Sequence, residues 1–223
     1  MRGINVELLL AASLAGGPAY AIDRSAGDSP ESALVTLFTT CEGPTSEKAF
    51  KEMREEVEES LEPAGITLAW RQLDLSQAID PVESLVVVRF RGICRAEFPD
   101  VRSGEQGPLG RTHVSEGEVL PFCEVNCDRV RDFIKCCGLQ QDGATRERTF
   151  GRALGRVVAH ELYHVLANTQ GHAKRGLAKS LLEPVELVGE NCDFEADSLR
   201  KIRRGPRTQP MSGDKSTAGE SGK

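Results

Sequence analysis

The longest regular hydrophobic pattern in the chain lies between residues 150 and 166. Apolar side chains recur there at steps of three and four, which is the spacing of one face of an α-helix. They are Phe150, Leu154, Val157, Val158, Leu162, Val165 and Leu166. Gly151 and Gly155 lie one turn apart in the same segment, where they would allow another backbone to pack closely. The pattern predicts a mostly buried helix from about residue 145 to 168.

Shorter apolar segments before this helix predict a sheet. Residues 33–38 and 85–90 are strongly apolar, and residues 66–71 alternate apolar and polar side chains as half-buried strands do. Ser46 is a suitable N-cap for a helix after the first of these strands. The apolar positions that follow it at helical spacing are Phe50, Met53, Val57 and Leu61. The order strand, helix, strand, strand predicts a mixed sheet with a right-handed crossover.

Four more elements are predicted around the long helix. Residues 99–117 are rich in glycine and proline, and within them residues 109–115 could form a short exposed strand. Residues 118–122 would return as another strand, Asn126 would cap a short helix, and residues 191–204 would form a C-terminal helix. The chain is therefore predicted to fold as a single α/β (α+β) domain around a mixed, twisted sheet.

The first 21 residues have the pattern of a secretory signal peptide. Arg2 supplies a positive charge, residues 8–15 form an apolar core, and the sequence Ala-Tyr-Ala before residue 22 matches a cleavage site. The apolar core is far shorter than the ~20 residues of a membrane-spanning helix. We therefore expect a mature domain of residues 22–204 that is secreted or periplasmic, with no membrane span. Residues 205–223 are polar and rich in glycine, serine and proline, which predicts a disordered tail.

The net charge indicates which binding partners to expect, and the cysteine content indicates the cellular compartment. The formal net charge of −6 is unchanged without residues 1–21, and a nucleic-acid partner, which would require a basic face, is not expected. Seven cysteines fit an oxidising compartment, where disulfides persist. We expect at least two intramolecular disulfides. Because the number of cysteines is odd, at least one cysteine has no partner within the chain. Cys136 and Cys137 should not pair, because a bridge between adjacent residues is strained.

The candidate chemistry lies on the long helix, at His160, Glu161 and His164. Two histidines four residues apart point the same way from a helix and can share one zinc ion. Glu161 lies at the edge of that face, where its carboxylate is too short to ligate but can take a proton from a water that the metal activates. Three of the chain's four histidines, these two and His172, fall in this short stretch. The pattern predicts a zinc site with Glu161 as catalytic base.

His172 is the candidate for the third zinc ligand. On an unbroken helix it would lie eight residues beyond His164, or about 12 Å along the axis, which is too far for one ion to reach both. The helix must therefore end between these two histidines. Asn168 and Gly171 are the residue types that most readily take the left-handed conformation in which helices end. A break near Asn168 would let His172 return beneath the metal.

The motif His160-Glu161-x-x-His164 resembles the zinc-binding helix of the zincin metallopeptidases. The order of strands and helices before it is similar to the N-terminal part of that family. The resemblance implies a zincin-like fold, zinc as the cofactor and hydrolysis of peptide bonds. It also implies that both histidines are zinc ligands and that Glu161 is the general base.

The residues after the motif resemble two branches of the family in part. Metzincins end the helix with a glycine where Ala167 stands, and place a third histidine where Gln170 stands. His172 follows two residues later in this chain. Gluzincins instead take a carboxylate from a later helix, for which this chain offers Glu183, Glu186, Glu190 and Glu195. Among these alternatives, we rank Glu186 and Glu190 behind His172.

The expected function is a secreted zinc metallopeptidase that hydrolyses a peptide or protein substrate with zinc-activated water. Residues 109–115 would form an edge strand along the cleft and pair with an extended peptide through their backbone. One alternative is a secreted binding or structural protein that holds zinc without catalysis. A second alternative is an interaction module held together by disulfides, in which the long helix only contributes to the hydrophobic core. Glu161 favours the enzyme, because a structural zinc site needs no base.

Overall fold

The structure of the protein is a computed structural model that describes residues 32–74, 76, 82–97, 107–137 and 142–205. All of these residues belong to one folded unit. The predicted signal peptide of residues 1–21 lies outside them, and so does the predicted tail apart from Gly205. Both therefore stay predictions.

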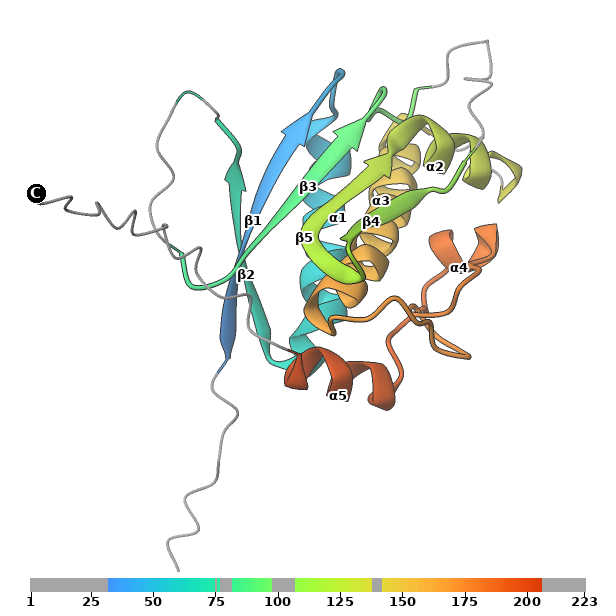
Figure 1. The fold of residues 1–223 in the computed structure, drawn as a ribbon. Coiled ribbons are helices and arrows are strands. Elements are labelled where there is room, and N and C mark those ends of the chain that lie inside the picture. The colour runs from blue at the N-terminus through green and yellow to red at the C-terminus, as the bar shows by residue number, and fades with distance from the viewer. Residues whose placement is uncertain (1–31, 75, 77–81, 98–106, 138–141, 206–223) are drawn as a thin grey trace, which may run out of the picture. The chain divides into compact units, whose positions relative to one another are not determined.

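Five strands form one sheet, and the sequence predicted each of them. They are β1 (Ala33–Cys41), β2 (Ile66–Gln72), β3 (Leu85–Arg91), β4 (Gly110–Ser115) and β5 (Glu118–Asn126). Their order across the sheet is β2-β1-β3-β5-β4, so β4 is an edge strand (Figure 1). β1 pairs in parallel with β2 and β3, β3 pairs in parallel with β5, and β4 runs antiparallel to β5. The mixed sheet and the exposed strand at residues 109–115 are confirmed.

β5 is longer than the predicted strand of residues 118–122 and lies inside the sheet although it contains Pro121. A proline has no N–H to donate to a neighbouring strand. Pairing with β3 begins only at Phe122, and the register with β4 shifts between Thr112 and Val114. Pro121 is tolerated because it lies where β5 extends beyond β3.

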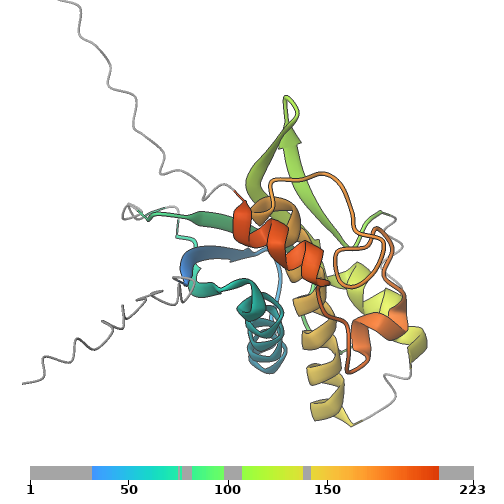
Figure 2. The same cartoon turned by 90° about the horizontal axis from the view of Figure 1, so that it is seen from below.

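Two helices cover one face of the sheet and lie side by side (Figures 1 and 2). α1 (Glu47–Leu61) begins after Ser46, whose side chain accepts a hydrogen bond from Ala49 N at 3.3 Å, as the sequence predicted. α3 (Gly143–Leu166) is the long helix, with Asp142 as its N-cap.

No helix in the described part of the chain combines the length and the apolar character needed to cross a membrane.

Two glycines of α3 set how closely these helices approach. A Cβ at Gly151 would lie 2.5 Å from the carbonyl oxygen of Ala49, and a Cβ at Gly155 would lie 2.8 Å from that of Met53. Both distances are too short for a carbon–oxygen contact, so a larger residue at either position would push α1 and α3 apart. The predicted close packing at these glycines is confirmed.

The hydrophobic core lies between the sheet and this pair of helices. Every apolar position that defined the predicted helix at residues 150–166 is buried. The side chains at the centre of the core are Leu37, Val86, Val88 and Phe90 from the sheet, Met53 and Val57 from α1, and Leu154, Val158 and Leu162 from α3. The long helix is therefore held rigidly along its length, which fixes the direction of the side chains on its remaining face.

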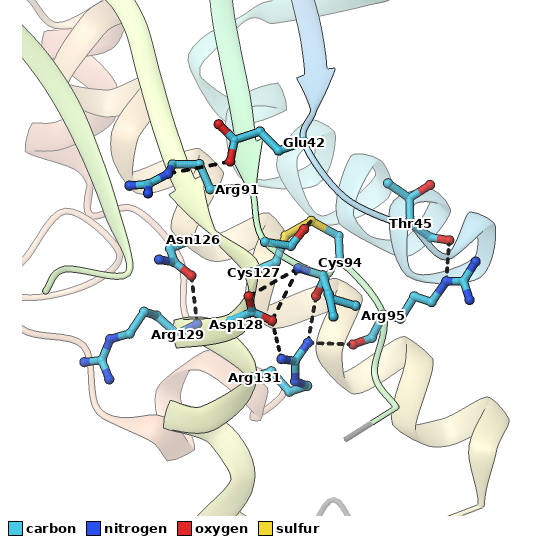
Figure 3. Close-up of a disulfide and its surroundings, with 12 residues drawn as sticks. Glu42, Thr45, Arg91, Cys94, Arg95, Asn126, Cys127, Asp128, Arg129 and Arg131 are labelled. Atoms are coloured by element: carbon cyan, nitrogen blue, oxygen red, sulfur yellow. Dashed lines mark hydrogen bonds and ion pairs between the residues drawn. A yellow bond between two sulfur atoms is a disulfide. The ribbon is translucent and has the colours of Figure 1, made fainter. Parts of the chain in front are cut away.

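A disulfide fastens the loop after β3 to the start of α2 (Cys127–Ile134), whose N-cap is Asn126 as predicted (Figure 3). Cys94 and Cys127 are both buried and form this bond across 33 positions of sequence. Beside it, Ile93 N donates to the Asp128 carboxylate, and the buried Arg131 donates to the carbonyl oxygen of Ile93 at 2.7 Å. The loop is thus tied to α2 by both covalent and polar contacts.

Of the at least two predicted disulfides, the described residues contain this one. Cys41, Cys123 and Cys192 carry free thiols. The side chain of Cys136 lies outside what the structure describes, so the prediction that it does not pair with Cys137 is not tested.

The described part of the chain after α3 contains two short helices, α4 (Pro184–Val188) and α5 (Ala196–Arg204). Two 3-10 turns lie earlier among the described residues, at Glu62–Ala64 and Lys135–Cys137. The predicted C-terminal helix of residues 191–204 was too long. Residues 191–195 are not helical, because the carbonyl oxygen of Asp193 accepts a hydrogen bond from Leu177 N at 2.9 Å. That tertiary contact holds the segment extended until the helix begins.

A buried arginine joins α1, α3 and the segment around α4. Arg156 is 2% exposed, and its Nε donates to the Glu56 carboxylate at 2.6 Å. Its Nη1 donates to the carbonyl oxygen of Glu186 at 2.6 Å, and its Nη2 to that of Glu190 at 3.4 Å. Because Arg156 lies one turn before His160, it ties the chain that follows the motif back to the motif helix.

Arg156→Ala is expected to lower the free energy of unfolding by about 3–5 kcal/mol. It removes the donor to two carbonyl groups and leaves the Glu56 carboxylate only its longer contact to Arg152 at 3.6 Å. Arg200→Ala is the matched control, since Arg200 pairs with Asp197 at the exposed surface, where an ion pair adds little stability. Urea unfolding followed by circular dichroism measures both variants. Equal loss of stability in the two would contradict the role of Arg156.

Candidate metal centre

α3 ends between His164 and His172, as it must if both histidines are to bind one metal ion. The helix stops at Leu166, and Asn168 takes a left-handed conformation with a φ of 44°. Thr169 N then donates to the carbonyl oxygen of His164 at 3.0 Å, which satisfies a group that the helix end leaves free. The predicted break near Asn168 is confirmed, and a left-handed Gly171 is not needed for it.

The break brings three imidazole rings together. The ring of His172 lies 5.3 Å from that of His160 and 4.7 Å from that of His164, measured between centroids. One ligand nitrogen from each of these histidines lies within 4.8 Å of the other two. The structure therefore gathers the three histidines that the sequence selected as a metal site.

Backbone carbonyls orient two of the rings. His160 Nδ1–H donates to the carbonyl oxygen of Leu177, and His164 Nδ1–H to that of Thr169, each at 2.8 Å. A carbonyl can only accept, so the proton of each neutral ring lies on Nδ1 and the lone pair on Nε2. The two Nε2 atoms are 3.3 Å apart. Ligand nitrogens of a tetrahedral zinc ion with bonds of about 2.0–2.1 Å are separated by roughly this distance, so the pair fits zinc.

Burial keeps these imidazoles neutral. The pKa of His160 is lowered to about 4, chiefly by burial and in smaller part by the neighbouring imidazoles of His164 and His172, while the hydrogen bond to Leu177 acts in the opposite direction. Burial also lowers the pKa of His164. Both rings are therefore unprotonated at neutral pH, which is the form that binds a metal.

Glu161 lies beside this cluster and is 6% exposed. The Thr112 hydroxyl of β4 donates to its Oε2 at 2.7 Å. Burial raises the pKa of the Glu161 carboxyl to about 7, while hydrogen bonds from Thr112 act in the opposite direction. A carboxyl group balanced in this way near neutral pH can both accept and release a proton.

The edge strand β4 lines a cleft that passes the cluster. Two pockets of about 300 Å³ each adjoin His160 and Glu161. The first has largely apolar walls, formed by Leu109, Phe133, Val157, Leu181 and Leu182. The second extends past Val114 and the two other histidines. The predicted position of residues 109–115, as an edge strand along the site, is confirmed.

The carboxylates considered as alternative third ligands lie elsewhere. Glu186 pairs with Lys179 Nζ at 2.5 Å and accepts a hydrogen bond from Glu183 N. Glu190 is exposed, and its backbone carbonyl contacts Arg156. Neither belongs to the group of potential metal ligands, which among the described residues consists of the three histidines.

Gln170 stands where metzincins place their third histidine, and it is used differently here. Its side-chain amide donates to the carbonyl oxygen of Gly117 at 3.0 Å. Gly117 belongs to the turn between β4 and β5, so this contact joins the loop of His172 to the hairpin. The structure thus explains why His172, two residues later, is the ring that reaches the cluster.

The sequence did not indicate Thr112, or the carbonyl groups of Leu177 and Thr169, as parts of this site. A threonine in a strand and two backbone oxygens carry no local signal. They become recognisable only when β4 and the loop after α3 are placed against the motif helix.

No family model matches the sequence, and no curated protein matches it. Among solved structures the chain is similar to the crystal structure of archaemetzincin from Methanopyrus kandleri. The two are 10% identical, the alignment covers 79% of this chain and 96% of that chain, and the TM-score is 0.48. A likeness this distant carries no conclusion about the activity of this chain.

Proposed function

We propose that this protein is a zinc-dependent metallopeptidase. The observation that carries the proposal is the convergence of three imidazoles and one buried carboxylate in a cleft beside an edge strand. The resemblance of His160-Glu161-x-x-His164 to the zincin helix implied the roles of these three residues, and His172 is the third ligand that the sequence added. We also propose that the protein is exported, in keeping with its disulfide and its N-terminal pattern.

His160, His164 and His172 would hold the metal. When bound, zinc supplies a Lewis acid that polarises the scissile carbonyl and makes water a better nucleophile at neutral pH. Three protein ligands would leave one coordination position open for water or substrate, which is the arrangement of catalytic zinc sites. The Leu177 and Thr169 carbonyls orient the rings of His160 and His164 so that their Nε2 atoms lie 3.3 Å apart and would face a bound metal.

Glu161 acts as the general base. Its carboxylate takes a proton from the attacking water and then transfers it to the nitrogen of the departing amine. It can serve both steps because it lies beside the histidines without belonging to the ligand group. Burial keeps bulk water from competing for that proton.

β4 and the apolar pocket would bind the substrate. β4 is an edge strand of the sheet that the described residues form, and an extended peptide can add beside it as a further strand through backbone hydrogen bonds. The pocket walled by Leu109, Phe133 and Val157 can take an apolar side chain next to the scissile bond. The substrate class is therefore a peptide or an unfolded segment of a protein.

A protein that keeps zinc only for structure is the weaker candidate. Structural zinc sites are closed by four protein ligands, and the described residues supply three here. The buried Glu161 would also have no purpose in such a site.

Metal analysis of the purified full chain, combined with a hydrolysis assay on a mixed peptide library, tests the proposal. We expect about one zinc ion per chain, cleavage beside apolar residues, loss of cleavage with a chelator, and recovery when zinc is returned. Bound zinc without cleavage of any peptide would favour the structural alternative. Protein that binds no zinc would refute the metal centre itself.

A further inference from the structure

Thr112 of the edge strand contacts the candidate general base through its side chain. Its Oγ1 lies 2.7 Å from Glu161 Oε2 and 3.1 Å from the carbonyl oxygen of Glu161. The hydroxyl has one proton, and the shorter contact to a charged acceptor is the stronger bond. Thr112 therefore donates to the carboxylate of Glu161 from a strand that lies 49 residues earlier in the sequence.

The backbone of Thr112 contacts the same carboxylate. The carbonyl oxygen of Leu109 accepts a hydrogen bond from Asn126 N on the β5 side. Backbone groups alternate in direction along an antiparallel strand, so those of Gly110 and Thr112 face the free edge. The amide of Thr112 donates there to the Glu161 carboxylate. One residue thus supplies two donors to one carboxylate.

Gly110 fixes how closely β4 approaches the carboxylate. A Cβ at this position would lie 2.6 Å from Glu161 Oε1 and 2.8 Å from Val157 Cγ1. The absence of a side chain therefore lets β4 lie directly against the motif helix. The Glu161 carboxylate is enclosed by Gly110 on one side and held by Thr112 on the other.

We propose that Thr112 is a positioning residue, which holds the Glu161 carboxylate with its hydroxyl and its amide in the orientation that proton transfer requires. This inference rests on the proposed peptidase function. A glutamate side chain has three rotatable bonds, and two fixed donors select one of its orientations before substrate arrives.

Thr112→Val tests the hydroxyl, because it removes the donor while keeping the branched shape of the side chain and the amide. We expect kcat to fall by about 10- to 100-fold, with KM and bound zinc unchanged, since a hydrogen bond to a charged group is lost. Thr112→Ser restores the hydroxyl and should recover most of kcat. Thr39→Val is the matched control, since its hydroxyl donates to the carbonyl oxygen of Arg71 between β1 and β2.

Hydrogen exchange of the Thr112 amide, followed by NMR on the zinc-loaded full chain, gives a readout that does not depend on activity. We expect this edge-strand amide to exchange at least about tenfold more slowly in the wild type than in Glu161→Ala. The amide of Arg111, which faces β5, should exchange equally in both proteins and serves as the internal reference.

Wild-type kcat in Thr112→Val, or a Thr112→Ser variant as slow as Thr112→Val, would overturn the positioning role. An unprotected Thr112 amide in the wild type would overturn the contact on which it rests. If the wild type binds zinc but cleaves no peptide, the proposed function fails and the positioning role with it. The exchange experiment still decides in that case whether Thr112 holds Glu161.

Discussion

Glu161→Gln is expected to lower kcat for peptide hydrolysis by about 10²- to 10⁴-fold while zinc remains bound. Glutamine has nearly the shape of glutamate, and its amide oxygen can still accept the hydrogen bond from Thr112. It cannot accept the proton of the attacking water, however, and therefore cannot deliver that proton to the leaving amine. Zinc should be retained because Glu161 lies outside the group of potential ligands.

The measurement compares kcat and zinc content of Glu161→Gln with those of the wild type and of Glu42→Gln. Glu42 pairs with Arg89 at the surface, so its replacement controls for the loss of one carboxylate elsewhere in the chain. Turnover at the wild-type rate in Glu161→Gln would remove the general-base assignment. Loss of zinc in the same variant would mean that Glu161 is a ligand instead.

His172→Ala is expected to weaken zinc binding by more than about 100-fold and to abolish hydrolysis. Loss of a hydrogen bond to a ligand already costs about 10- to 100-fold in metal affinity, and loss of the ligand itself costs more. The two remaining histidines on the helix would be left with a largely hydrated ion. Zinc affinity measured by competition with a chromogenic chelator reports this directly.

Three variants make that experiment specific. His113→Ala removes the one histidine outside the cluster, which instead contacts Glu124 on β5, and should leave zinc binding unchanged. Glu186→Ala and Glu190→Ala remove the carboxylates that the sequence left open as third ligands, and both should keep zinc. Full zinc occupancy in His172→Ala, or loss of zinc in either glutamate variant, would overturn the assignment of His172.

The sequence by itself determined the features that depend on near neighbours along the chain. The apolar period of residues 150–166 gave the long helix, and Ser46 marked the start of α1, because a helix and its cap are set within a few residues. The spacing of His160 and His164 fixed their common face for the same reason. Even the break at Asn168 followed from local geometry, since the rise of an unbroken helix is incompatible with a third ligand at His172.

Only the tertiary structure decided which distant segments meet. The separation of 49 residues between Thr112 and Glu161 carries no periodicity, and their contact exists because β4 forms the edge of the sheet next to α3. The sequence left Glu186 open as a third ligand behind His172, and in the structure its carboxylate pairs with Lys179 and lies outside the group of potential ligands. The pairing of Cys94 with Cys127 and the late start of α5 likewise depend on packing across the whole domain. Local sequence specifies which chemical groups an element presents, whereas the order of strands and the closing of loops determine which of those groups come together at one site.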